Sequence, residues 1–155
     1  PKTDKAVITW KVYCIRKYKN NLYFLSNLDL KTNKVDVKIP WEIDKKVNLG
    51  ENIGTIEATF IHGDGLSIQK CENKLTISYR QGGELIKPIG HRINKSLKNL
   101  FQENKILPWK RDKIPLIYYQ DELISVADLW LNQNYIASQN EPGFVVKWHK
   151  KMSIK

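Results

Sequence analysis

The sequence lacks the features that define several large classes of protein. No apolar run approaches the ~20 residues of a membrane-spanning helix, and no signal peptide is recognisable. Cys14 and Cys71 are the only cysteines, too few for a disulfide scaffold. A single disulfide stays open, but reduced thiols in a cytoplasmic protein are favoured. The chain begins with Pro1 and its only methionine is Met152, so we expect a fragment of a longer protein.

Motifs for binding ATP are also missing. The sequence contains neither a Gly-x-x-x-x-Gly-Lys-Ser/Thr loop nor a Ser-Gly-Gly-x-Asp-Ser loop. Gly82-Gly83 leads into Glu84 and not into the start of a helix. We therefore interpret the glycine pair as a turn that uses positive φ, and not as a phosphate-binding nest.

The histidines give little support to metal binding or to catalysis. His62, His91 and His149 are far apart, and no cysteine or acid lies near them at metal-ligand spacing. His62 and Asp64 are the one candidate for a general acid–base pair in a stand-alone hydrolase. A turn histidine with a local hydrogen bond is the commoner arrangement. Asp121-Glu122 are interpreted as turn formers.

Most of the chain shows the period-two alternation of strands with one buried face. Turn residues at 19–21 and 120–122 predict two hairpins, and Pro40 is expected to end a strand. The expected strands cover residues 8–14, 22–25, 35–39, 53–61, 66–68, 75–79, 116–119, 123–131 and 144–148. Many short strands predict a mainly β, sandwich-like fold, with one or two short helices inserted near residues 95–113.

A soft boundary near residues 70–74 suggests two lobes. Residues 1–74 would form an N-terminal β lobe that links to an absent catalytic region, and residues 75–155 a second, more densely basic lobe. One continuous module is the alternative, and the pattern does not decide between them.

Residues 95–105 predict an amphipathic helix, with Asn94 as its N-cap and Asn104 at its end. Pro108 suits the first position of a second short turn. At 100° per residue one side is apolar and would face the core: Leu97, Leu100 and Phe101. The opposite side is basic and polar: Lys95, Lys98, Asn99, Gln102 and Lys105.

Local charge favours a phosphate-binding role for this side over a merely solvated one. Residues 87–113 hold eight basic and two acidic side chains, a net charge of +6 out of +10 for the chain. His91 beside Arg92 is a candidate for a phosphate or sugar contact. Trp109 would stack on a base or anchor the core, with the core favoured. Arg111 and Asp112 form a candidate pair within the turn.

Several motifs in a fixed order resemble one known family. They are Arg80, Pro88-x-Gly90, Lys95-Ser96-Leu97-Lys98-Asn99-Leu100-Phe101-Gln102, Pro108-Trp109-x-Arg111-Asp112-x-x-Pro115-Leu116 and Asp121-Glu122-Leu123-x-x-Val126-Ala127. Over about residues 75–131 this pattern resembles the C-terminal domain of tRNA(Ile)-lysidine synthetase. Residues 6–25 more weakly resemble the segment that precedes it. Asn99 replaces a usual lysine, and Asp128 replaces a usual glycine.

The resemblance implies a β-sandwich module that binds the acceptor stem of tRNA(Ile). The family ligates lysine to the wobble cytidine in a catalytic N-terminal domain that uses ATP with Mg²⁺ and is absent here. No cofactor is expected in this fragment. The tRNA-binding candidates are Lys95, Lys98, Arg92, His91, Asn99, Gln102, Lys105, Lys110 and Arg111.

One rival interpretation comes from another functional class. A non-catalytic protein-interaction or dimerisation module would use its basic surface only for solubility. Strand edges near Trp10 or Trp148 would supply the contact, and a homodimer stays open.

Overall fold

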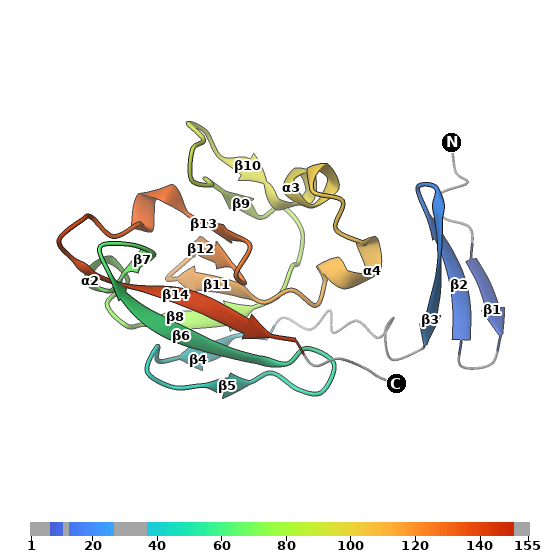
Figure 1. Cartoon of the computed structure of the whole chain (residues 1–155), viewed down its shortest axis with the longest axis horizontal. Coiled ribbons are helices and arrows are strands. Elements are labelled where there is room, and N and C mark those ends of the chain that lie inside the picture. The colour runs from blue at the N-terminus through green and yellow to red at the C-terminus, as the bar shows by residue number, and fades with distance from the viewer. Residues whose placement is uncertain (1–6, 11–12, 27–36, 151–155) are drawn as a thin grey trace.

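A computed structural model describes residues 7–10, 13–26 and 37–150, with the side chains of residues 8–10 outside the description. The fold is mainly β, as the sequence predicts, with short helices between the strands. Its strands form two larger sheets, a three-stranded sheet near the N-terminus and a two-stranded hairpin (Figure 1).

Two sheets pack face to face and confirm the sandwich. The first has the order β13-β12-β11-β8-β4 and contains β4 (Ile39–Trp41), β8 (Leu75–Ser78), β11 (Leu116–Tyr119), β12 (Glu122–Val126) and β13 (Trp130–Leu131). The second has the order β5-β6-β14-β7 and contains β5 (Val47–Asn48), β6 (Thr55–His62), β7 (Leu66–Ser67) and β14 (Pro142–His149). Ile77 and Ile117 of the first sheet share one buried cluster with Phe144 and Val146 of the second. Strands from both sides of residue 74 contribute to both sheets.

The outer face of the five-stranded sheet is covered as well. The hairpin of β9 (Leu85–Ile86) and β10 (Lys95–Ser96) leads into α3 (Leu97–Glu103), and both lie over this face (Figure 1). Phe101 and Ile86 share a second buried cluster there with Leu116 and Val126. Because both faces are covered, β12 is an almost continuous buried run and does not alternate.

The remaining helices are short. They are α2 (Ile68–Cys71), α4 (Pro108–Arg111) and the 3-10 turn η2 (Gln133–Tyr135). The start of α2 falls at the end of the strand expected at 66–68. The Ser67 hydroxyl accepts the N–H of Lys70, which caps this helix and stops the strand.

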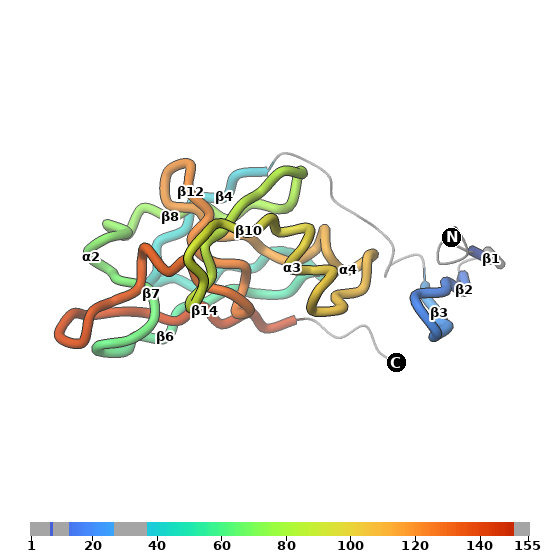
Figure 2. The backbone as a smooth tube through the Cα atoms, turned by 90° about the horizontal axis from the view of Figure 1, so that it is seen from above, coloured from blue at the N-terminus to red at the C-terminus, as the bar shows by residue number. Residues whose placement is uncertain are grey.

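The N-terminal strands form a separate sheet beside α4 (Figure 2). It consists of β1 (Val7–Trp10), β2 (Tyr13–Tyr18) and β3 (Asn21–Ser26). Cys14 and Leu25 on one face bury Trp109 of α4, and the rings of Tyr18 and Tyr23 meet the same indole edge-on.

Other strand limits differ from the expectation for local reasons. The run at 8–14 belongs to two strands, and the hairpin partner of β3 is Tyr13–Tyr18. Pro40 lies inside β4, where an edge position tolerates its missing N–H. Residues 35–36 lie outside the described residues. The run at 123–131 breaks at Ala127, whose φ is 45° and whose N–H donates to the Pro115 carbonyl. The other expected strands and both hairpin turns are confirmed within about two residues.

Candidate nucleic-acid interface

Helix α3 is fixed by its cap and by its apolar side. The Ser96 hydroxyl accepts the N–H of Asn99 at 3.1 Å, which satisfies a donor at the helix start. Three side chains are buried against the five-stranded sheet: Leu97, Leu100 and Phe101. The opposite side exposes Lys98, Asn99 and Gln102, as the helical wheel predicts.

The expected start of the helix is wrong by two residues. Lys95 and Ser96 pair with Ile86 and Leu85 as strand β10, so Ser96 replaces Asn94 as the N-cap. The end is confirmed, because Asn104 is the C-cap and its side-chain amide donates to the Leu100 carbonyl. The expected role of Pro108 at the start of a second helix is also confirmed.

Lys95 is therefore not a residue of the basic helix side. Its ammonium group lies 2.8 Å from a carboxylate oxygen of Glu103, and its side chain is 25% exposed. Glu103 is the only acid in α3. The ion pair therefore offsets the one negative charge of the helix and gives Lys95 a partner within the protein. Lys98, by contrast, lies beside a hollow of the surface.

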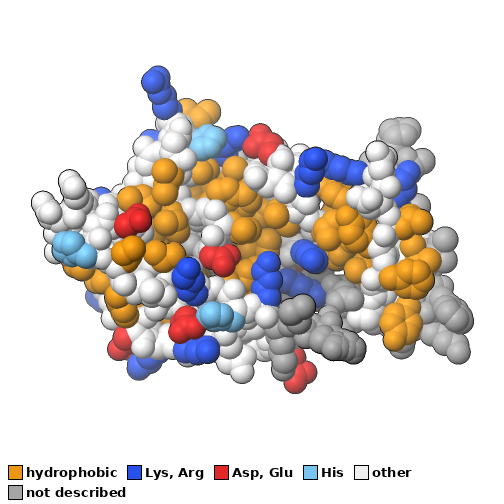
Figure 3. Space-filling model, in the orientation of Figure 1, with side chains coloured by type: hydrophobic (Ala, Val, Ile, Leu, Met, Phe, Trp, Pro, Cys, Tyr) orange, Lys and Arg blue, Asp and Glu red, His pale blue; other side chains and the backbone are white. Residues whose placement is uncertain are grey.

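Lys98 lines a polar hollow of about 310 Å³ between α3, α4 and the loop from β8 to β9. The lining residues are Arg80, Gln81, Gly82, Gly83, Glu84, Lys98, Arg111 and Asp112. Three of these are cationic and two are acidic. Lys and Arg side chains also gather around α3 and α4 on the face shown in Figure 3.

The two arginines of the hollow are held in place by other groups. Arg80 donates from Nε to the Asp112 carboxylate at 3.1 Å, and its guanidinium lies 5.9 Å from the centre of the Phe101 ring. Arg111 donates from Nε to the Ile106 carbonyl at 2.9 Å and is buried. Burial lowers the pKa of Arg111, while Tyr18 opposes this shift. The ordinary value lies so far above 7 that the group stays cationic.

The Gly82-Gly83 turn is closed by the carboxylate of Glu84. This carboxylate accepts the N–H of Gln81 at 2.6 Å and the N–H of Gly82 at 3.1 Å. Both glycines have positive φ, 116° and 84°, as the expected turn requires. Burial raises the pKa of the nearby Tyr118 to about 12, and the charge of Glu84 acts in the same direction.

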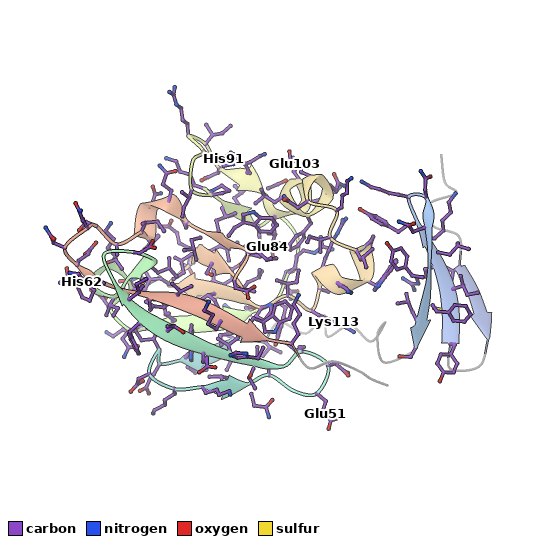
Figure 4. All side chains as sticks on the ribbon, in the orientation of Figure 1. Glu51, His62, Glu84, His91, Glu103 and Lys113 are labelled. Carbon is purple, nitrogen blue, oxygen red and sulfur yellow. The ribbon has the colours of Figure 1, made fainter. Side chains whose placement is uncertain are left out.

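The other predicted site residues do not form one cluster. Lys98 and Arg111 line the hollow, and Lys105, after α3, and Lys110, in α4, are exposed. His91 and Arg92 are exposed at the tip of the β9–β10 hairpin, away from α4 (Figure 4). Trp109, which follows Pro108, is buried as favoured.

Two residues of the hollow, Arg80 and Glu84, are absent from the sequence-based candidates. Arg80 follows β8 and Glu84 follows the glycine pair. The sequence signal for these two residues was a basic and an acidic side chain on either side of a Gly-Gly turn. Asp112, the expected partner of Arg111, accepts a hydrogen bond from Arg80.

The hydrolase hypothesis gains no geometric support. His62 lies at the end of the sandwich far from α4 (Figure 4). Both His62 and Asp64 are exposed, and Asp64 accepts the N–H of Gly65. Among the described residues, no three His, Cys, Asp or Glu side chains are grouped so as to hold a metal ion. Within the same ranges no helix has both the length and the apolar character of a membrane span. Cys14 and Cys71 are free thiols in different clusters.

Comparison with known proteins gives one consistent result. The family model described as the TilS substrate C-terminal domain matches residues 75–148, a range that includes the whole hollow and α3. The tRNA(Ile)-lysidine synthase of Coxiella burnetii is 34% identical over 141 residues, which are 91% of this chain and 31% of the relative. The tRNA(Ile)-lysidine synthase of Hamiltonella defensa is 32% identical over 145 residues, with 89% and 32% covered. The chain thus spans about a third of the length of these relatives.

A solved structure shares the fold. A crystal structure of a TILS C-terminal domain superposes with a TM-score of 0.60 at 17% identity. The match covers all of that domain and 77% of this chain.

Proposed function

Residues 75–148 belong to the TilS substrate C-terminal domain family of tRNA(Ile)-lysidine synthase (synthetase), and we propose that the chain binds tRNA(Ile) by its acceptor stem. The binding surface is the exposed side of α3 together with the adjacent hollow. Lys98, Asn99 and Gln102 supply the helix contacts. Lys105 and Lys110 extend the surface.

The observation that carries this proposal is the convergence of three cationic side chains on one hollow. Arg80, Lys98 and Arg111 come from the end of a strand, from α3 and from α4. Both acids of the hollow already have partners, because Arg80 holds Asp112 and backbone N–H groups hold Glu84. An RNA phosphate entering the hollow would therefore meet cationic donors, with the charge of Asp112 offset by Arg80 and that of Glu84 remaining.

The mode of recognition follows from the shape of RNA. A-form helices present phosphates and 2′-hydroxyls more readily than the base edges of their deep major groove. Contacts by Lys and Arg would thus be mainly to the backbone, and Asn99 or Gln102 can donate to ribose hydroxyls. Counterion release then predicts that log affinity falls by roughly 0.7–0.9 per phosphate contact per decade of salt.

The chemistry of the complete enzyme would lie outside these residues. In the longer polypeptide another region would use ATP and Mg²⁺ to join lysine to the wobble cytidine. This chain would hold the acceptor stem of the same tRNA, far from the anticodon. Their contribution to the reaction is positioning, because a tRNA bound at two places presents its anticodon in a defined orientation.

Lys98→Ala and Lys95→Ala form a matched pair that tests the surface. Both remove one lysine from the same short segment, but Lys95 is already engaged by Glu103. We expect Lys98→Ala to weaken tRNA(Ile) binding and to reduce the salt slope by about 0.7–0.9. Lys95→Ala should change both quantities less. Filter binding across about 50–200 mM salt measures these effects.

Circular dichroism spectra of the two variants control for folding. An affinity and slope for Lys98→Ala equal to those of the wild type would remove α3 from the interface. A larger effect for Lys95→Ala than for Lys98→Ala would move the contact to the β9–β10 hairpin. Competition by an acceptor-stem minihelix tests the part of the tRNA that is bound, because failure to compete would contradict acceptor-stem recognition.

A further inference from the structure

The sheet β1–β3 has an apolar face that points away from α4. Cys14 and Leu25 lie on the face that buries Trp109. Their neighbours Tyr13 and Phe24 point to the other side, as the alternation of a strand requires. Tyr13 is 52% exposed, Leu22 is 72% exposed and Phe24 is 76% exposed. Figure 3 shows hydrophobic side chains over this part of the surface.

The side chains of this face form cross-strand neighbours and not isolated exposures. Phe24 is paired with Ile15 and Leu22 with Lys17 in the β2–β3 register. Directly paired residues in an antiparallel sheet interact through their side chains. The outward face is therefore a continuous apolar strip with Lys17 at its end, and such strips on soluble proteins mark contact surfaces.

The sheet is small, and its contacts with the rest of the described structure lie on one face. In the described residues its three strands pair only with one another. Three strands can be stable in water when one hydrophobic face packs against a helix, as the face toward α4 does here. One face contacts Trp109 and its neighbours, whereas on the other face Tyr13, Leu22 and Phe24 stay exposed among the described residues.

The comparisons indicate that the segment carrying this sheet also occurs in longer proteins. The Coxiella relative matches all but about fourteen residues of this chain, so the match must include part of residues 7–26. At least part of the segment that carries the sheet therefore has a counterpart in a protein about three times as long. By contrast, the entire solved C-terminal domain corresponds to only 77% of this chain. Part of this chain therefore extends beyond the solved domain.

We propose that the outward face of β1–β3, with Tyr13, Ile15, Leu22 and Phe24, docks on the part of the synthase polypeptide that lies outside these 155 residues. The proposal rests on the proposed function only in taking the chain as part of a longer synthase. A segment of the same polypeptide is held nearby at high effective concentration, so a modest apolar face suffices. A second copy is disfavoured because each copy carries a net charge of +10.

Thiol labelling of Phe24→Cys tests this docking. The variant is prepared in the 155-residue chain and in the full-length protein, and its reaction with a maleimide is timed in both. The native thiols contribute little, because Cys14 and Cys71 are buried and burial raises the pKa of Cys71 to about 12. Asn20→Cys in the exposed β2–β3 turn is the matched control on the same sheet. Leu22→Cys repeats the test if Phe24→Cys impairs folding.

We expect labelling of Phe24→Cys to be at least 10-fold slower in the full-length protein, while Asn20→Cys changes less than 2-fold. Equal rates for Phe24→Cys in the two proteins would overturn the proposal. Protection already present in the 155-residue chain and rising with its concentration would identify a second copy and would also overturn it. No RNA is present, so this result is independent of the Lys98→Ala binding test.

Discussion

At the scale of single residues, the charges of the interface are matched individually. Glu103 engages Lys95, Asp112 engages Arg80, and Glu84 engages two backbone N–H groups. Within the described ranges Lys98 is in no ion pair, although it lines the same hollow. The net charge of a segment is therefore a poor guide to which lysine can meet a phosphate.

Glu84 allows the effect of a single charge in the hollow to be measured. Its negative charge opposes an incoming phosphate, and its carboxylate oxygens accept backbone N–H groups of the Gly82-Gly83 turn. Glu84→Gln keeps one acceptor oxygen and removes the charge. We expect tRNA(Ile) affinity to rise about two- to five-fold at low salt and the gain to shrink as salt screens the charge. Filter binding of the variant and of Asp121→Asn, an exposed acid in the β11–β12 turn, measures the effect. A decrease in affinity for Glu84→Gln alone would assign the carboxylate a direct role in binding.

The sequence predicts some of these residues and not others, for a physical reason. The helical wheel correctly exposes Lys98, Asn99 and Gln102, because helix periodicity is a local property. The Lys95–Glu103 pair spans eight residues and the Arg80–Asp112 pair spans 32. Such contacts depend on how a strand enters a helix and on which elements pack together, and no local pattern records them.

At the scale of elements, the first turn of α3 shows how two local signals compete. Asn94 and Ser96 are both good N-caps. The pairing of Lys95 with Ile86 and of Ser96 with Leu85 extends the β9–β10 hairpin up to Ser96, so the helix begins at Leu97, two residues later than expected. The helical wheel places Lys95 in the helix because it considers only the spacing along one segment. It takes no account of the strand pairing of Lys95 with Ile86, nine residues earlier.

The Arg80–Asp112 pair joins the end of β8 to α4, and it should stabilise the wall of the hollow. The side chains of Arg80 and Asp112 are only 24% and 11% exposed, so the bond is partly shielded from water. We expect Asp112→Asn to lower the free energy of unfolding by about 1–2 kcal/mol. A double-mutant cycle with Arg80→Gln, followed by urea denaturation, should give a coupling energy of about 1 kcal/mol. Additive effects would show that the contact does not stabilise the fold.

At the scale of the whole molecule, the sandwich was predictable and its extra layer was not. Period-two runs mark most strands, yet the sequence cannot state that α3 and the β9–β10 hairpin cover the outer face of the five-stranded sheet. That cover explains the continuous apolar run Leu123–Val126. The separate sheet β1–β3 escaped prediction for a similar reason, because its neighbour Trp109 lies more than 80 residues further along the chain.

Trp109 is the link between this sheet and the rest of the molecule. Its ring is enclosed by Cys14, Leu25, Tyr18 and Tyr23, and among the described residues its indole nitrogen has no hydrogen-bond partner. Trp109→Ala should therefore release β1–β3, with a local loss of about 3–5 kcal/mol. Trp109→Phe keeps an aromatic ring and forfeits no hydrogen bond, so its loss should be smaller.

Hydrogen exchange resolved by peptide distinguishes release of the sheet from general destabilisation. We expect the amides of residues 13–26 to lose protection in Trp109→Ala while those of β11 and β12 keep theirs, because the sandwich has its own core. In the full-length protein the proposed docking of the outward face would preserve part of the protection of β2 and β3 even without the indole. Equal loss of protection throughout the chain would instead mean that the sheet and the sandwich unfold as one cooperative unit, with Trp109 belonging to a common core.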